Sequence, residues 1–249
     1  MSASVPSAAT VVLLRDGMEG LETFLMRRVA SMAFAPRMHV FPGGRLDALD
    51  FEVDVTITGA DPEVLARRAS ADVDELHALY SCAIRETREE TGIDLANVGC
   101  DESLIIEASA LPIIDHWVTP EGESRRYDVR FFAAMVTGDD ARLTTTEADE
   151  VLWARPTDAL GAFAAGRMPM LPPTESVLRW LTGFASAADA LMAGAERPVV
   201  PLLPRRRDDS ASWVLVNDRT GEIIVDEVPA PHTREDDGRP RSSVDGQRS

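Results

Sequence analysis

Cysteine is nearly absent from this chain of 249 residues, which holds only Cys82 and Cys100. The two cysteines form no Cys-x-x-Cys pair, and Cys82 falls inside a predicted helix, so neither a disulfide framework nor a zinc site is indicated. Long apolar runs are also missing. No stretch reaches the roughly 18 apolar residues of a membrane-spanning helix, and the N-terminus has no early basic cluster. These absences predict a cytoplasmic protein without a membrane partner.

Basic residues are few relative to acidic ones: 25 face 42 Asp and Glu, and the formal net charge is -17. A general negative field repels phosphate polymers and anionic bilayers, so no nucleic acid polymer is expected as a partner. A small anionic substrate is compatible with this charge if metal ions and a few local arginines neutralise it.

Several catalytic signatures are missing as well. The chain contains no GxxxxGK[ST], GxGxxG, GxSxG or HExxH pattern, and these are the usual short signatures of phosphate-binding, dinucleotide-binding, hydrolase and zinc-peptidase sites. The four histidines are scattered along the chain, so a histidine-centred mechanism has little support.

Predicted strands and helices are mixed along the chain. Two β-rich runs, 9–15 and 22–28, flank the turn "DGMEG" and predict a hairpin, and a loop rich in Pro and Gly follows over 31–50. Asp-Pro predicts a helix at 61–70; a D-x-x-E capping box, apolar spacings of three and four, and Gly92 predict another at about 73–91. Further strands are expected at 111–119, 126–136 and 150–155, helices from 156, over 171–184 and over 186–195, and a hairpin over 212–227. Without strict βαβ alternation, this order predicts an α+β fold, an α/β/α sandwich around a mixed sheet.

Three glutamates, Glu86, Glu89 and Glu90, lie near the end of the second predicted helix. On a helix they fall within about 100° of arc, beside the apolar stripe. Carboxylates held together repel one another, and a hard divalent cation such as Mg²⁺ or Mn²⁺ relieves that repulsion. The alternative is a solvated helix end that Arg85 and Arg88 neutralise in part. The surrounding string favours the metal site.

That string resembles the signature of the Nudix hydrolases. "RETREETG" at 85–92, followed by Ile93, matches R-E-U-x-E-E-x-G-U, where U is a bulky apolar residue, except that Thr87 stands at the first U. "FPGGRLD" at 41–47 resembles the loop that opens the signature, with Gly44 at its leading glycine. The family's G-x5-E-x7-R spacing is not kept, because Arg85 follows Gly44 by 41 positions instead of 14, which leaves 27 extra residues. Counted back from Arg85, the acidic position falls on His77, so that group is missing or comes from elsewhere in the insert.

Such an insertion is similar to one branch of the family, the peroxisomal coenzyme A diphosphatases and their bacterial relatives. "RRYDVRFF" at 125–132 resembles a downstream segment of that branch. A coenzyme A motif upstream of the glycine pair is kept in part. Arg27 fits it, whereas Ala33 and Arg37 stand where an arginine and a glycine are expected.

The resemblance implies one domain with additions. We expect a disordered N-terminus over 1–8 and a single Nudix domain over 9–228, with an insertion at about 48–74 and extra C-terminal helices and a hairpin at about 156–228. Residues 229–249 are polar and nearly devoid of apolar side chains. Because such a segment cannot offset its ordering entropy, it is expected to be a disordered tail.

The implied reaction is the metal-dependent hydrolysis of a diphosphate that joins a nucleoside to another group. Coenzyme A or its thioesters, NADH, ADP-ribose and dinucleoside polyphosphates stay open as substrates. Mg²⁺ or Mn²⁺ is the implied cofactor, and pairing among many relatives suggests a homodimer. An alternative from another class is a catalytically silent Nudix-fold module that binds a nucleotide.

Matching the motif assigns roles to individual residues. Arg85 is expected to orient a glutamate, and Glu86 is expected to bind metal or to handle the proton of water. Glu147 is the candidate general base outside the signature, although its acidic loop is equally compatible with solvation. The implied metal ligands are Gly44 through its carbonyl oxygen, Glu86, Glu89 and Glu90. The candidates for phosphate contacts are Arg27, Arg45, Arg125 and Arg126.

Overall fold

Two sheets and the helices that cover them make up the fold, which the computed structural model describes over residues 5–228, apart from residues 33, 101, 138–143, 207–212 and 219. The strands are β1 (Ser7–Gly17), β2 (Gly20–Arg28), β3 (His39–Val40), β4 (Gly43–Arg45), β5 (Val55–Thr58), β6 (Asn97–Val98), β7 (Leu104–Glu107), β8 (Ile113–Val118), β9 (Asp128–Met135), β10 (Ala148–Ala154), β11 (Leu202–Arg206), β12 (Trp213–Asn217) and β13 (Ile223–Val228). The helices are α1 (Pro62–Ala69), α2 (Val73–Thr91), α3 (Pro156–Ala164), α4 (Pro172–Leu181) and α5 (Ala187–Glu196), with a 3-10 helix η1 (Ala48–Phe51).

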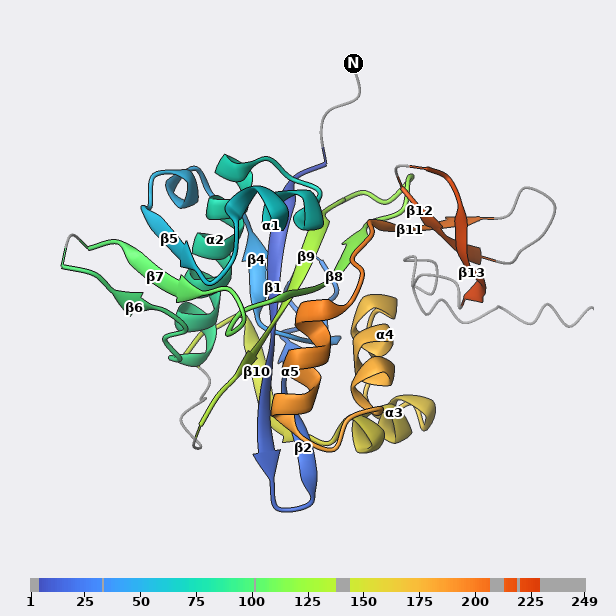
Figure 1. The fold of residues 1–249 in the computed structure, drawn as a ribbon. Coiled ribbons are helices and arrows are strands. Elements are labelled where there is room, and N and C mark those ends of the chain that lie inside the picture. Colours follow the sequence, from blue (N-terminus) through green and yellow to red (C-terminus); the bar gives the residue numbers. More distant parts are fainter. Residues whose placement is uncertain are drawn as a thin grey trace, which may run out of the picture.

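The larger sheet forms the middle layer of the molecule (Figure 1). Its strand order is β10-β2-β1-β9-β8-β11-β12-β13, with β3 paired to β2 and β4 to β1. β1 and β9 run parallel, as do β8 and β11, whereas the other pairs of this sheet are antiparallel. The sheet is therefore mixed, as the sequence predicts.

β1 shows why helices cover both faces of this sheet. Side chains alternate between the faces of a strand. Val11 and Leu13 pack with residues of α1 and α2, while Val12 and Leu14 pack with residues of α3, α4 and α5. All four side chains are fully buried. This arrangement confirms the expected α/β/α sandwich.

The structure contains the hairpins and helices expected from the sequence. β1 and β2 pair antiparallel across the predicted turn, and β12 pairs antiparallel with β13. α2 has the predicted bounds, and the Asp61 carboxylate caps α1 by accepting a hydrogen bond from the Glu63 amide. Position 219, in the last hairpin turn, is outside the described residues.

Several short elements differ from expectation. The region 31–50, predicted to be a loop, contains β3, β4 and η1. β11 and the small sheet β5-β7-β6 were not expected at all. Strands of two to five residues are too short to show a clear alternation of apolar and polar side chains. β5 pairs with β7 almost 50 positions away, so contacts between distant segments determine where these strands form. β1 begins at Ser7, two residues before the expected start of the domain.

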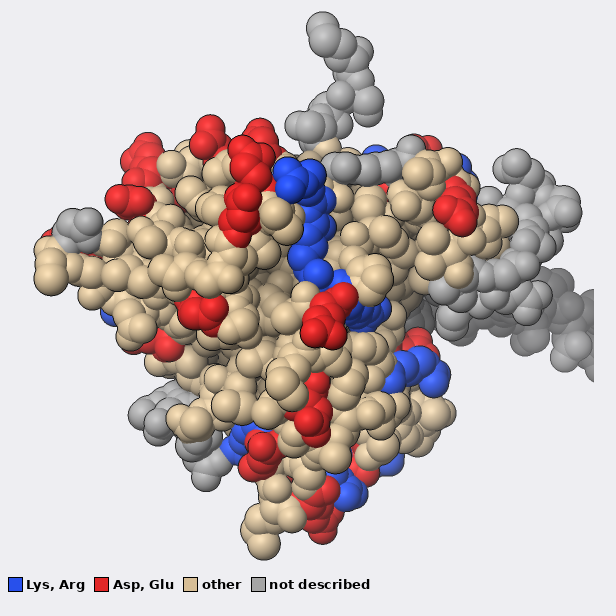
Figure 2. Space-filling model, viewed as in Figure 1, with Lys and Arg blue, Asp and Glu red and all other residues tan. Residues whose placement is uncertain are grey.

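The remaining domain limits stay predictions, and the expected tail at 229–249 lies outside the described residues, as do residues 1–4. On the face shown in Figure 2, acidic side chains gather around η1 and α1, and basic side chains form a narrow band beside them. Across the described segments, no helix is long and apolar enough to cross a bilayer.

Candidate active site

α2 carries the three glutamates, and local signals set both of its ends. Asp72 caps its start by accepting a 2.8 Å hydrogen bond from the Glu75 amide. Gly92 ends it in the left-handed region at φ 75°, where glycine meets no steric penalty. The last turns of α2 therefore have a fixed place beside β4, on which the glutamates converge.

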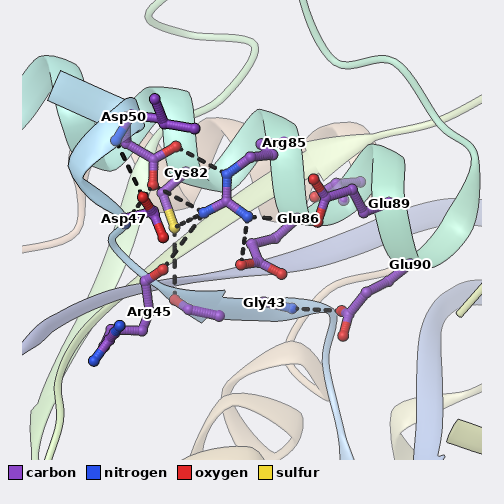
Figure 3. A network of polar contacts seen from close by, with 12 residues as sticks. Gly43, Arg45, Asp47, Asp50, Cys82, Arg85, Glu86, Glu89 and Glu90 are labelled. Atoms are coloured by element: carbon purple, nitrogen blue, oxygen red, sulfur yellow. Dashed lines mark hydrogen bonds and ion pairs between the residues drawn. The ribbon is translucent and has the colours of Figure 1, made fainter. Parts of the chain in front are cut away.

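The glycine pair brings the backbone of β4 against this helix. The Gly43 amide donates a 2.8 Å hydrogen bond to Glu90 Oε2, as Figure 3 shows. The thiol of Cys82 donates to the Gly44 carbonyl oxygen at 3.6 Å. A Cβ at position 44 would lie 2.2 Å from Glu86 Oε1, so any larger residue would displace that carboxylate.

Alanine is expected to lower the stability of the protein at position 43 and its turnover at position 44. At Gly43, whose φ is +154°, a Cβ would lie 2.4 Å from the Ala9 carbonyl oxygen and 2.7 Å from Thr10 Cα. Because this backbone cannot move without disturbing β1, G43A should destabilise the protein by about 3 kcal/mol. G44A meets only the mobile end of Glu86, so it should keep the melting temperature within a few degrees but displace that carboxylate and lower turnover. Thermal unfolding and turnover of both variants test the contrast, which equal melting temperatures would contradict.

Arg85 is the centre of the polar network in Figure 3. Its Nε and Nη2 donate to the two carboxylate oxygens of Asp50 at 3.0 and 2.8 Å. Its Nη1 donates to Glu86 Oε1 at 2.7 Å and reaches Glu89 Oε2 at 3.5 Å. These partners raise the pKa of Arg85, with the Asp50 hydrogen bond as the largest cause and burial opposing it. The guanidinium thus fixes the direction of Glu86 relative to η1.

Asp50 is the functional residue that sequence reasoning missed. It is 1 % exposed, and the Asp47 amide and the Ser81 hydroxyl also donate to its carboxylate. Counting back from Arg85 had placed the acidic position on His77. Counting forward from Gly44 through five residues reaches Asp50, which was the available signal. The acidic partner of Arg85 therefore keeps its spacing to Gly44, and the extra residues follow Asp50 instead of containing it.

The glutamates differ strongly in environment. Glu90 is 5 % exposed, and burial raises its pKa to about 8, with the Gly43 amide opposing and Glu86 adding to the shift. Burial also raises the pKa of Glu86, although Arg85 opposes it. The Glu89 side chain is 60 % exposed. Glu86 and Glu90 therefore lie where a negative charge is poorly solvated, and a bound cation would stabilise that charge.

Within the described part of the chain, no group of three or more acidic, His or Cys side chains is arranged as a ready metal cluster. Arg85 contacts both Glu86 and Glu89, and Glu90 turns to the Gly43 amide. The donor chemistry nevertheless fits a hard divalent ion, because carboxylates and the nearby Gly44 carbonyl are oxygen ligands.

A cavity of about 560 Å³ opens beside the glycine pair. It is lined by Gly43, Gly44 and Glu86 and also by three of the predicted residues, Arg45, Arg125 and Glu147. Glu147 approaches Arg28 to 4.0 Å and is half exposed. Its loop is joined to α2 by the Thr144 hydroxyl, which donates to the Glu89 carbonyl oxygen at 2.6 Å. The structure therefore places the Glu147 loop next to the helix of glutamates.

Two of the expected phosphate-binding arginines lie outside this cavity. Arg27 pairs with Asp149 at 2.7 Å and with Glu150 at 2.6 Å on the edge formed by β2 and β10. Arg126 donates to the Thr119 carbonyl oxygen and lines a neighbouring polar cavity of about 760 Å³. Arg45 lines both cavities and so stands between them.

The backbone conformation at Arg37 shows why the coenzyme A motif expects glycine at this position. Arg37 has a φ of 62°, in the left-handed region where glycine is favoured. The motif expects glycine at this position, and the structure shows a backbone that glycine would adopt without strain. The second departure, Ala33, lies outside the described residues.

A mixed sheet between helix layers, with the glycine pair of β4 against the glutamate-bearing helix α2, is the architecture of the Nudix fold. The NUDIX domain model matches residues 5–180, and the chain belongs to that family. It is therefore a hydrolase that cleaves the pyrophosphate bond of nucleoside diphosphate derivatives. Nudix hydrolases generally use divalent metal ions. This assignment decides against the catalytically silent module.

Two relatives give this assignment its detail. An acyl-coenzyme A diphosphatase, NUDT19 of Gallus gallus, is 23% identical over 71% of this chain and 67% of its own length. The crystal structure of a NUDIX hydrolase from Alicyclobacillus acidocaldarius is 28% identical, covers 77% of this chain and 97% of that chain, and superposes with a TM-score of 0.63. The resemblance to the coenzyme A diphosphatase branch is thus confirmed by a curated relative.

Proposed function

We propose that this protein hydrolyses coenzyme A or acyl-coenzyme A in a reaction that depends on Mg²⁺ or Mn²⁺. The products would be 3',5'-ADP and 4'-phosphopantetheine or its acyl derivative. The observation that carries the proposal is the cavity of about 560 Å³ that Gly43, Gly44 and Glu86 line, with Glu90 hydrogen-bonded to the Gly43 amide. The similarity to the acyl-coenzyme A diphosphatase supports the choice of substrate.

The site residues divide into those that hold metal and those that hold the substrate. Glu86, Glu89, Glu90 and the Gly44 carbonyl oxygen would bind the divalent ions, whose charge would neutralise the diphosphate and acidify water. Arg85 keeps Glu86 in position through their 2.7 Å contact. Arg45 and Arg125, which line the cavity, would contact phosphate oxygens, with Arg27 and Arg126 placed farther out.

The reaction needs a group that accepts a proton. The oxygen of water forms a new bond to one phosphorus, and the bond from that phosphorus to the bridging oxygen breaks. We assign the proton of water to the Glu147 carboxylate, because Glu147 lines the cavity and more than half of its side chain stays exposed. The bridging oxygen leaves with the second phosphate.

A substrate panel tests this proposal directly. Coenzyme A, an acyl-coenzyme A, NADH, ADP-ribose and a dinucleoside polyphosphate are each incubated with Mg²⁺ and with Mn²⁺, and the products are identified by mass. We expect 3',5'-ADP and a phosphopantetheine product to form fastest. A marked preference for NADH, ADP-ribose or the dinucleoside polyphosphate would transfer the proposal to that substrate, and turnover in excess EDTA would contradict metal dependence.

We also propose that the protein is cytoplasmic and forms a homodimer. Sedimentation at several protein concentrations would test the assembly, and a single species of about 27.1 kDa would exclude the dimer.

A further inference from the structure

The cavity beside Glu86 has an apolar side that the proposed chemistry does not use. Phe34 and Tyr127 meet there edge to face, with ring centroids 5.4 Å apart. Trp117 from β8 and Val129 from β9 continue this side. Glu86, the glycine pair and this apolar side thus line one cavity, so a substrate bound beside Glu86 would lie next to the apolar side.

Four prolines give the apolar side its chemical character. Pro120, Pro172, Pro173 and Pro204 all line the cavity, together with Leu171 at the start of α4. Proline has no backbone N–H, so these positions offer no donor to a ligand. A sugar or a nucleobase placed against them would find carbonyl oxygens at most, so its acceptor atoms would lose hydrogen bonds to water without replacement, which costs free energy. An alkyl group loses nothing.

We propose that this proline-rich wall holds the non-nucleotide arm of the substrate, an arm that begins with a branched alkyl group beyond the diphosphate. Leu171 and Val129 are the residues that determine this specificity. The nucleotide arm then leaves the site on the side of Arg45, which also lines the adjoining polar cavity. The inference rests on the proposed function, since it orients the substrate of the same site.

Part of the wall comes from the C-terminal additions to the fold. Pro204 belongs to β11 and lies beyond residue 180, where the family match ends. β11 reaches the cavity because it pairs with β8, whose Trp117 is registered with Leu202. β11 therefore helps to shape this cavity.

Leu171→Asn is a variant that should fold well. Leu171 is the N-cap of α4, with φ -79° and ψ 156°, and its side chain makes no capping hydrogen bond. Asparagine is among the best N-cap residues, so the exchange supplies a missing cap while it makes the wall polar. Val129→Thr is a second variant of nearly unchanged shape. Met18→Asn, at a fully exposed hairpin turn, is the matched control.

Two substrates that share ADP isolate the arm in question. Dephospho-coenzyme A carries the branched alkyl arm, whereas ADP-ribose carries a sugar in its place. We expect Leu171→Asn to lower kcat/KM for dephospho-coenzyme A about tenfold and Val129→Thr to lower it severalfold, with kcat/KM for ADP-ribose unchanged or raised in both. The control variant should change neither. Equal losses for the two substrates, or no loss for dephospho-coenzyme A, would overturn the proposal.

Binding of pantetheine separates this inference from the proposed function. Pantetheine has no phosphate, so its binding to the protein in EDTA can be followed by calorimetry over a millimolar range, independently of turnover. We expect Leu171→Asn to weaken it severalfold. If the wild type binds pantetheine but cleaves no coenzyme A derivative, the proposed function fails and the wall assignment stands. If the wild type does not bind pantetheine, the wall assignment fails, whichever substrate is cleaved.

Discussion

Replacing Glu90 with glutamine is expected to reduce metal-dependent turnover by about 100-fold or more while the protein stays folded. Glutamine keeps an oxygen that accepts the hydrogen bond from the Gly43 amide, which Glu90 Oε2 accepts at 2.8 Å. It removes the negative charge that a divalent ion requires. Turnover under saturating Mg²⁺ measures the loss, and unchanged turnover would remove Glu90 from the metal site.

The same variant should be more stable than the wild type without metal, and increasingly so at high pH. Burial raises the pKa of Glu90 from 4.5 to about 8. Between these values the folded protein holds a proton that the unfolded chain releases, so the contribution of Glu90 to stability is complete below pH 4.5 and is lost as the pH rises through 8. Glutamine does not titrate. Melting temperatures in EDTA from pH 5 to 9 should therefore diverge in favour of E90Q, and parallel curves would contradict the buried carboxylate.

Replacing Arg85 with methionine should give the largest loss of stability among the site variants. Asp50 is 1 % exposed and takes two hydrogen bonds from the guanidinium, at 3.0 and 2.8 Å. Without Arg85 its charge stays buried and uncompensated, at a cost of about 3–5 kcal/mol. In a domain of this size each kcal/mol corresponds to roughly 2–4 °C in Tm. Turnover should fall as well, because Glu86 loses its 2.7 Å contact.

The double variant R85M/D50N separates these two effects. Asparagine removes the buried charge and retains one oxygen for the Asp47 amide, which donates to Asp50 Oδ2 at 2.8 Å. Its NH2 group takes the place of Oδ1, to which the Ser81 hydroxyl donates at 3.2 Å, and the hydroxyl can turn to accept from it. Much of the lost Tm should return, whereas turnover should stay low. Recovery of turnover together with stability would show that Arg85 acts only by holding η1 in place.

The sequence predicted the elements whose signals are local. The bounds of α2 were correct because Asp72 and Gly92 mark its ends. The β1–β2 hairpin was found because its turn signals lie between two apolar runs. By contrast, β5 and β7 are four residues each and gain their stability from pairing across distant segments, which no local pattern reports.

The candidate site was predictable to the extent that its residues share one motif. Glu86, Glu90 and the glycine pair meet as the motif implies. Arg27, a candidate for phosphate contact, pairs with Asp149 and Glu150, and the sequence did not predict these pairs because it does not tell which carboxylates will lie opposite a given strand. The proline-rich wall joins segments about 30 residues apart or more, from β8 to β11, and so became visible only in three dimensions.

The contact between η1 and α2 allows the fold to hold extra residues between the two halves of the signature. Asp50 and Arg85 are 35 positions apart in the chain, yet their charged hydrogen bonds fix the two elements directly against each other. The segment between them contains β5, which pairs with β7 beyond the end of α2. Chain length between the two halves of the signature is thereby uncoupled from the geometry of the carboxylates. Segments of different size can be grafted at this point over evolutionary time, and the chemistry of the site is free to stay constant while its surroundings diversify.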